Sequence, residues 1–463
     1  MSSRKTNPIR SARRDFLRQA CCAAVGSTGV LSTLAQLRLI GAVAAAGASR
    51  VRAAAVPADY KALVCVFLYG GNDGSNTIIP TSATDYSDYA RVRGALAVSQ
   101  SSLLPIAPRR HSDGRSYGLH PAVPELQRQF QQGRLAILAN VGTLVQPVTL
   151  AQFRNNQALP PQLFAHNEQA TQWQSSVPDR PFQTGWGGRV ADLVNTFNAN
   201  NQISMSISLT GQNSFQVGQS VSQFSVGSGG ITPMGVGATI AGGVRRIVAS
   251  APPNLLEAAF GGVTRTAIDD NALLGSLLQT APTLRTAFPN SNLGRQLRMV
   301  ATLISLAPAL RLKRQIFFCS IQGFDTHALQ LPSHGPLLAE VSAALAAFYD
   351  ATVELAVANL VTAFTASDFG RTYTINTDGT DHGWGNQQFV IGGAVQGGDI
   401  YGTMPSLALG GPDDTGQGRW LPTTSVDEYS ATLATWFGVS ATDLPVVLPN
   451  IGRFAKPNLG FMG

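Results

Sequence analysis

Acidic and imidazole side chains follow three apolar segments of the chain, at positions where they could hold metal ions. The three segments are LVCVFLYGGNDG, QIFFCSIQGFDTH and LVTAFTASDFGRTYTINTDGTDHGWG. Carboxylates and neutral imidazoles are common ligands of zinc and of neighbouring metals. The sequence therefore predicts a site for divalent metal ions (Zn, Mg, Mn or Ca), and the candidate ligands are Asp73, Asp325, His327, Asp368 and His382.

Each candidate ligand also has a structural interpretation. Asp73 and Asp368 could cap helices by accepting hydrogen bonds from backbone amides at a helix start. His327 and His382 could be hydrogen-bonded histidines without a metal. Two of the six histidines lie near Asp in loops after apolar segments. Because perturbed titratable groups gather at functional sites, we favour the ligand interpretation.

Three further residues are candidates for catalysis. Arg371 lies three residues beyond Asp368, where its guanidinium could bind phosphate or sulfate oxygens bidentately, although a salt bridge with Asp368 is the simpler alternative. Asn72 precedes Asp73 and could bind the same oxygens. His166 stands in the polar segment LFAHNEQ, and for it a catalytic and a structural role both remain open.

The chain pattern predicts the sheet that would bring these residues together. Short, apolar and uncharged runs predict buried strands, at residues 62–69, 135–141, 315–322, 360–366 and 389–392. Apolar periodicity and helix signals predict helices between them, among others at residues 254–259, 270–279, 292–306, 337–357 and 426–437. Alternating strands and helices indicate an α/β fold with parallel pairing. Ligands bind such sheets at the carboxyl ends of the strands, where the candidate ligands would lie.

Two segments differ from this alternation. Residues 109–117 contain Asp113-Gly114 and predict a hairpin. Residues 202–245 are rich in Gln, Ser, Gly and Val, and they predict a small antiparallel insertion or a loop-rich lid over one edge of the main sheet. We expect residues 56–463 to form a single domain that carries this insertion.

The first 55 residues carry most of the positive charge. They hold nine Lys or Arg and one acid, a net charge of +8, and subtracting this from +7 for the whole chain leaves −1. The segment SARRDFLR looks like a twin-arginine export signal. We therefore predict that residues 1–55 are a signal peptide read by the twin-arginine export machinery, that no membrane span remains after cleavage, and that the protein is periplasmic or secreted. The near-neutral remainder gives no reason to expect a nucleic-acid partner.

Cysteine usage and missing motifs narrow the classes of function. Cys65 and Cys319 each fall inside a predicted strand; we favour two buried thiols over a disulfide, since neighbouring strands rarely present bridging geometry. The sequence has no G-x-S-x-G elbow, P-loop or C-x-x-C motif. This counts against a serine esterase of the common fold, an NTPase and a thioredoxin-like enzyme.

The chain resembles an exported bacterial family called domain of unknown function 1501. The resemblance rests on the twin-arginine start and on YGGNDGSNTIIP, LHPAVPELQRQFQQGRLAILANVG, GFDTHALQ, SDFGRT, GTDHGWG and RWLPTTSVDEYSATLATWFGV. That family is related to the alkaline phosphatase-like superfamily, which includes sulfatases and cofactor-independent phosphoglycerate mutases. The resemblance implies a three-layer α/β/α fold with a bimetal site. Asp73 and Asp368 would bind one metal, and Asp325, His327 and His382 would bind the other.

Two positions depart from the pattern that the resemblance implies. The superfamily's usual Asp-His-Gly is Asp368-Phe369-Gly370 here, so one expected histidine ligand is missing. Many family members carry Ser where this chain has Ala165. Two hypotheses follow. The first is an exported metal-dependent hydrolase that acts on a phosphate or sulfate ester of a small molecule or polymer, and the second is a non-catalytic binding or assembly protein of the cell envelope.

Overall fold

The computed structural model describes residues 56–463 apart from 111–112, 199–202, 232–237 and 250–253. The predicted signal peptide therefore lies outside the described residues. The chain divides into two compact units. Of the described residues, the larger comprises 56–230 and 277–463, and the smaller lies within 231–276.

A large, mostly parallel sheet forms the centre of the larger unit. Its order is β11-β5-β10-β9-β1-β8-β6-β7, and β12 pairs with β5. Every pairing is parallel except the two that β10 makes with β5 and β9. The strands are β1 (Lys61–Leu68), β5 (Leu135–Gly142), β6 (Ser206–Ser208), β7 (Phe224–Ser225), β8 (Arg314–Ile321), β9 (Val361–Ser367), β10 (Asn386–Gly392), β11 (Asp399–Tyr401) and β12 (Thr424–Ser425). The predicted α/β class with a mostly parallel sheet is confirmed.

The three central strands end level with one another. Leu68 of β1 pairs with Ile321 of β8 on one side and with Ser367 of β9 on the other. All residues of β8 and β9 are buried, as expected for parallel strands covered on both faces. The loops that carry the candidate ligands therefore leave the sheet side by side at its carboxyl edge.

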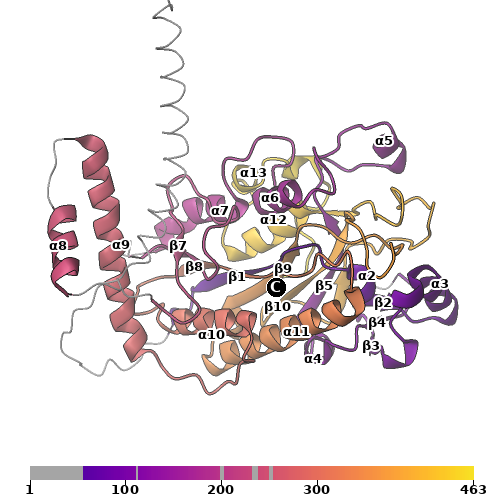
Figure 1. The fold of residues 1–463 in the computed structure, drawn as a ribbon, viewed down its shortest axis with the longest axis horizontal. Coiled ribbons are helices and arrows are strands. Elements are labelled where there is room, and N and C mark those ends of the chain that lie inside the picture. The colour runs from indigo at the N-terminus through magenta and orange to yellow at the C-terminus, as the bar shows by residue number, and fades with distance from the viewer. Residues whose placement is uncertain (1–55, 111–112, 199–202, 232–237, 250–253) are drawn as a thin grey trace, which may run out of the picture. The chain divides into compact units, whose positions relative to one another are not determined.

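Helices cover both faces of this sheet (Figure 1). Figure 1 shows α6 (His166–Ser175), α7 (Trp186–Val194) and α12 (Val426–Phe437) on one side, and α10 (Asn292–Ser305) and α11 (Gln330–Glu354) on the other. The sequence explains where several of them begin: Ser425 and Glu428 form a capping box on α12, and Ser291 caps α10. The remaining α-helices of this unit are α2 (Gly74–Thr77), α3 (Ala83–Arg93), α4 (Pro124–Gln131), α5 (Leu150–Arg154) and α13 (Leu444–Val447).

Helix α11 passes a length and composition test for a membrane span among the described residues. However, 56% of its most apolar window is buried inside the structure. A core helix passes the same test, so this is weak evidence for a span.

A second, three-stranded sheet replaces the hairpin predicted over residues 109–117. Its order is β2-β4-β3, with β2 (Ile78–Pro80), β3 (Leu104–Ile106) and β4 (Tyr117–Leu119). β3 and β4 pair antiparallel and flank the predicted segment, so the hairpin strands lie further apart in the chain than predicted. Asp113 accepts hydrogen bonds from Arg115 and Tyr117 instead of closing a two-residue turn.

The segment predicted as an antiparallel insertion extends the main sheet instead. β6 pairs in parallel with β8, and β7 pairs in parallel with β6, so the antiparallel alternative is wrong. The strand content of this segment is two short strands at the edge of the main sheet. Part of the Gly-rich patch, residues 232–237, lies outside the described residues.

In the smaller unit, α8 (Ala238–Ala249) is followed by α9 (Leu255–Thr280). The two helices predicted at residues 254–259 and 270–279 are one continuous helix. The glycines between them permit close packing: a Cβ at Gly261 would lie 3.2 Å from the carbonyl oxygen of Val248 in α8.

Cys65 of β1 and Cys319 of β8 are buried free thiols. Cys65 is opposite Phe318, and Cys319 is opposite Val66. The preference for thiols over a disulfide is confirmed.

Candidate metal centre

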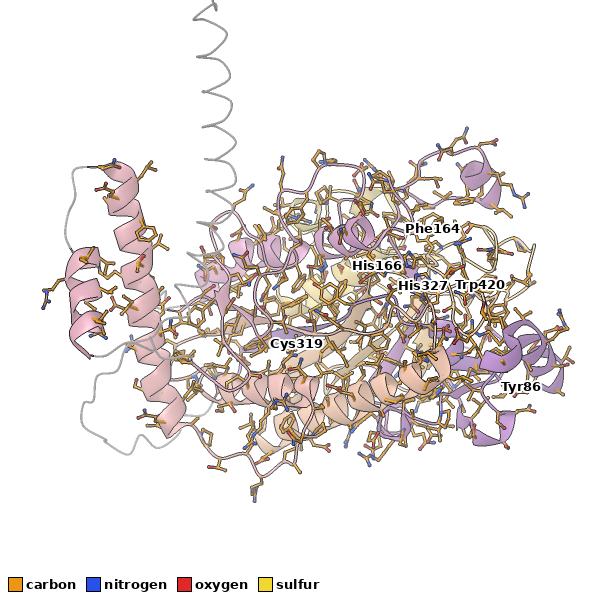
Figure 2. The ribbon with its side chains drawn as sticks, viewed as in Figure 1. Tyr86, Phe164, His166, Cys319, His327 and Trp420 are labelled. Atoms are coloured by element: carbon orange, nitrogen blue, oxygen red, sulfur yellow. The ribbon has the colours of Figure 1, made fainter. Side chains whose placement is uncertain are left out.

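Four side chains meet above the carboxyl edge of the central strands. The carboxylate oxygen Oδ1 of Asp325 lies 3.3 Å from Nε2 of His166, 3.2 Å from Nε2 of His327 and 3.4 Å from Nε2 of His382. The Nε2 atoms of His327 and His382 are 2.7 Å apart. Figure 2 shows the labelled His166 and His327 close to one another, with Phe164 beside them and Cys319 further down in the sheet.

The loop after β1 holds this edge of the sheet in place. The N–H of Gly70 donates to Oδ2 of Asp368 at 3.1 Å, and its carbonyl accepts a hydrogen bond from Arg371 at 3.0 Å. Gly70 has φ +113°, and a Cβ at this position would lie 2.2 Å from the backbone nitrogen of Asp325. Only glycine therefore allows the loops after β1 and β8 to approach each other this closely.

Each histidine of the centre is fixed through its other ring nitrogen. Nδ1 of His166 lies 2.6 Å from Oδ2 of Asp368. Nδ1 of His327 lies 3.2 Å from Oδ1 of Asp381. Nδ1 of His382 lies 2.6 Å from the backbone carbonyl of Phe164. A carbonyl can only accept, and an ionised carboxylate can only accept, so each Nδ1 carries its proton. In a neutral ring each Nε2 then presents a lone pair.

This tautomer assignment leaves four electron pairs pointing at one another. Three Nε2 lone pairs and one carboxylate oxygen cannot hydrogen-bond among themselves, and a cation between them relieves the repulsion. Zinc bound at about 2.0–2.1 Å in a tetrahedron sets its ligand atoms about 3.3–3.4 Å apart. The three distances from Asp325 Oδ1 agree with that spacing, whereas the 2.7 Å between the Nε2 atoms of His327 and His382 is shorter than it.

Two buried atoms support the same interpretation. Nε2 of His166 and Oδ1 of Asp368 are buried and have no hydrogen-bond partner in the structure. Buried polar atoms without partners are rare. His166, Asp325 and His382 each offer one ligand atom, and these atoms lie within 4.8 Å of one another. The residues present therefore fit a metal ion.

The pKa directions of Asp325 and His382 suit metal ligands. Burial raises the pKa of Asp325, but the hydrogen bond and charge of Arg371 outweigh burial and lower it overall. Burial lowers the pKa of His382, which favours its neutral form. The hydrogen bond that His166 donates to Asp368, opposed by burial, raises the pKa of His166, which favours its protonated form in the absence of a metal. A carboxylate that stays ionised beside an imidazole that stays neutral makes an acceptor pair.

The structure brings three of the five predicted ligands together and adds a fourth. Asp325, His327 and His382 converge as the sequence predicted, and His166 joins them from the first turn of α6. Asp368 lies behind His166 and orients it. The predicted division into two poles is replaced by one group, in which the ligand atoms of His166, Asp325 and His382 lie within 4.8 Å of one another. His327 joins this group through Asp325 and His382, and Asp368 lies behind His166 as an orienting carboxylate.

Asp73 does not reach this cluster. It caps α2 by accepting hydrogen bonds from the backbone of Ser75 and Asn76, and its carboxylate forms a fully buried ion pair with Arg93 of α3. Burial opposes its ionisation, but Arg93 and other neighbours lower its pKa overall. The capping alternative describes Asp73, and the prediction that it binds metal is corrected because its oxygens already have partners.

Asn72 and Arg371 are also occupied by the protein itself. Oδ1 of Asn72 lies 2.9 Å from Nε2 of His334, and its amide donates to Thr77. Arg371 is completely buried and donates to Asp325 Oδ1 at 2.8 Å, to Gly70 and to Thr380. Neither side chain is free to bind a substrate oxygen, and the salt bridge expected with Asp368 is made with Asp325. Arg371 is a positioning residue.

Two groups at the centre escaped the sequence prediction. Asp381 stands next to His382 in a segment that already drew attention, so an Asp-His pair in a strand-end loop was an available signal for it. Phe164 acts through its backbone carbonyl, which no side-chain pattern can reveal; its φ of +70° turns that carbonyl toward His382. Strained backbone of this kind is found at functional sites.

Phe369 packs against two histidines of the centre. Its ring is fully buried, and its centroid lies 4.7 Å from that of the His166 ring and 4.6 Å from that of the His382 ring. Phe369 therefore forms an apolar wall of the centre. Ala165 precedes α6 and makes no side-chain cap.

The comparisons with known proteins cover part of the chain. Residues 303–428 match the family described as "Protein of unknown function (DUF1501)", and this range includes Asp325, His327, Asp368 and His382 but not His166. The crystal structure of Ps i-CgsB is weakly similar, with 8% identity and a TM-score of 0.36 over 86% of this chain and 77% of that one. Its complex with k-i-k-neocarrahexaose has 9% identity and a TM-score of 0.32 over the same shares. No curated protein gives a significant match.

The ion pair of Asp73 predicts a stability effect without a metal effect. Asp73→Ala leaves the buried guanidinium of Arg93 without its partner, so the free energy of unfolding should fall by about 3–5 kcal/mol. Urea unfolding measures this, and Asp59→Ala, which breaks an exposed pair with Lys313, should change it little. If the folded Asp73→Ala protein loses its bound metal, the placement of Asp73 outside the centre is wrong.

The hydrogen bond from His327 to Asp381 predicts an effect on metal affinity. Asp381→Asn weakens the orientation of His327, and changes of this kind cost about 10- to 100-fold in affinity. Zinc titration of the metal-free protein against a competing chelator measures it. Asp378→Asn, an exposed change in the same loop, is the matched control. Equal affinities for the Asp381→Asn and Asp378→Asn proteins would contradict the role given to Asp381.

Proposed function

We propose that this protein is an exported metal-dependent hydrolase that acts on a phosphate or sulfate ester. The observation that carries the proposal is the convergence of three Nε2 lone pairs on Asp325 Oδ1, with each Nδ1 held by an oxygen. Three imidazoles and one carboxylate favour zinc or a neighbouring transition metal over Mg or Ca, which prefer oxygen ligands.

The roles of the residues follow from their contacts. His166, Asp325, His327 and His382 would hold the ion. When bound, the ion would polarise the ester oxygen and activate water for attack. Arg371 keeps Asp325 ionised and in place. The described hydrogen bonds and ion-pair contacts of Asp325 involve Oδ1, which leaves Oδ2 of this half-exposed carboxylate to accept a hydrogen bond from the attacking water.

The wider assignment rests on the resemblance set out from the sequence. We propose a three-layer α/β/α fold of the alkaline phosphatase-like kind, which agrees with the mostly parallel sheet and with helices on both of its faces. We also propose that residues 1–55 direct the chain through the twin-arginine machinery to the periplasm or outside the cell. Export of a protein already folded suits a centre assembled from three distant segments.

A second candidate function is a binding or assembly protein of the cell envelope that keeps the fold and lacks turnover. The internal engagement of Asn72 and Arg371 favours it, because these were the residues expected to bind the ester's oxygens. Phe369 in place of a histidine ligand favours it as well. This candidate retains the metal for structural reasons.

Hydrolysis assays separate the two candidates. Zinc- or manganese-loaded protein should release p-nitrophenol from p-nitrophenyl phosphate or p-nitrophenyl sulfate. His327→Ala and His382→Ala should lose the activity together with the metal while keeping the circular dichroism spectrum. His120→Ala alters a histidine outside the centre and should keep both metal and activity. If the metal-loaded wild-type protein hydrolyses neither ester, the hydrolase proposal is wrong and the binding protein is the favoured candidate.

A further inference from the structure

A polar cleft opens at the same sheet edge as the metal centre. Its volume is about 740 Å³, within the range of small-molecule sites. It is built from the residues that follow β1 and β6, the end of β8, and the sides of α10 and α11. Seven polar, uncharged side chains line it: Tyr69, Thr210, Gln212, Asn292, Gln296, Ser320 and Gln322. The amide of Gln296 is already engaged by the backbone of Ser320.

The polar groups of this cleft are short of partners. The side chains of Thr210, Gln212, Asn292, Ser320 and Gln322 make no hydrogen bond with another described residue, although the backbones of Ser320 and Thr210 bond the side chains of Gln296 and Ser208. Tyr69 accepts one from Gln174 at 3.3 Å and keeps its own hydroxyl proton to donate. The set combines amide donors, amide acceptors and hydroxyls, which together match groups that both donate and accept.

The charges of the cleft are as informative as its hydrogen-bonding groups. Among the described residues that line it there is no Lys, Arg or His, and the one carboxylate, Glu340, already accepts the backbone N–H of Leu293 at 2.8 Å. An anionic ligand would find no countercharge here. An apolar ligand would strip water from unpaired amides, which costs about 1–3 kcal/mol for each group left unsatisfied. A neutral ligand rich in hydroxyl groups avoids both penalties.

The cleft adjoins the metal centre along the chain. Tyr69 is followed directly by Gly70, which contacts Asp368 and Arg371. Gln322 precedes Asp325 by three residues, so their Cα atoms are at most about 11 Å apart. The carbonyl of Tyr69 accepts the N–H of Phe324, which ties these two walls together. A ligand in the cleft can therefore extend to the metal centre.

We propose that this cleft binds the alcohol half of the ester, and that this half is an uncharged, hydroxyl-rich compound such as a neutral sugar. The proposal rests on the proposed hydrolase function for the reaction, and its binding step can be tested alone. In the reaction, water bonds to phosphorus or sulfur, the bond from that atom to the ester oxygen breaks, and the sugar leaves as an alcohol after taking up a proton.

A glycan array tests the binding step directly. Fluorescently labelled full-length protein is applied to an array that carries neutral, sulfated and carboxylated glycans. We expect signal on neutral glycans. Gln322→Ala and Asn292→Ala should each lower it by about 3- to 10-fold, the effect of one or two lost hydrogen bonds. Gln157→Ala changes an exposed glutamine outside the cleft and should leave it unchanged.

The outcomes separate this inference from the proposed hydrolase. Signal confined to charged glycans, no signal on any glycan, or neutral-glycan signal untouched by Gln322→Ala and Asn292→Ala would each overturn the inference. His327→Ala removes a metal ligand and should keep the neutral-glycan signal. A protein that binds neutral glycans and hydrolyses no ester would contradict the proposed hydrolase function. The same result would support the inferred specificity of the cleft.

Discussion

The structure of the site depends on one electrostatic constraint: three imidazole lone pairs and a carboxylate oxygen face a common point. Such an arrangement persists only if each ring is prevented from turning its N–H inward. Asp368, Asp381 and the carbonyl of Phe164 prevent this by engaging the three Nδ1 atoms. The groups that bind the Nδ1 atoms therefore determine what the Nε2 atoms can do. Carboxylate–histidine pairs act in the same way around bound metals.

The sheet contributes by ending three strands at the same level. Because β9, β1 and β8 are parallel and their last residues pair with one another, the residues that follow them start from one edge. Gly70 then lets the loop after β1 lie against the backbone of Asp325. Arg371 crosses the gap, binding Gly70 and Asp325 together. Fold and site are joined through these few contacts, so a change in one loop reaches the carboxylate at the centre.

Sequence patterns correctly predicted which residues lie at the carboxyl edge of the central strands. They predicted poorly which partners the side chains at this edge contact. Strands such as β8 and β9 are apolar throughout, so their ends, and the Asp residues beyond them, can be read directly. Asp73 and Asp368 look alike by that criterion. They differ because Arg93 of α3 forms an ion pair with Asp73 and not with Asp368. Arg93 lies twenty residues after Asp73, and this spacing does not predict the pair. The role of His166 could not be predicted either. It depends on α6 starting opposite β9, and this is a feature of the tertiary structure that the sequence pattern does not show.

The position of Phe369 bears on how many ions the centre can hold. A second ion beside the first would need ligands on the side of Asp368. The buried ring of Phe369 occupies that side and contacts His166 and His382. Asp73 cannot contribute a ligand because its carboxylate is paired with Arg93. Among the described residues around Asp368, its Oδ1 is the buried acceptor without a hydrogen-bond partner. One carboxylate oxygen beside an aromatic wall is too little to hold a divalent ion, so the arrangement favours a single-metal centre with Asp368 as its orienting group.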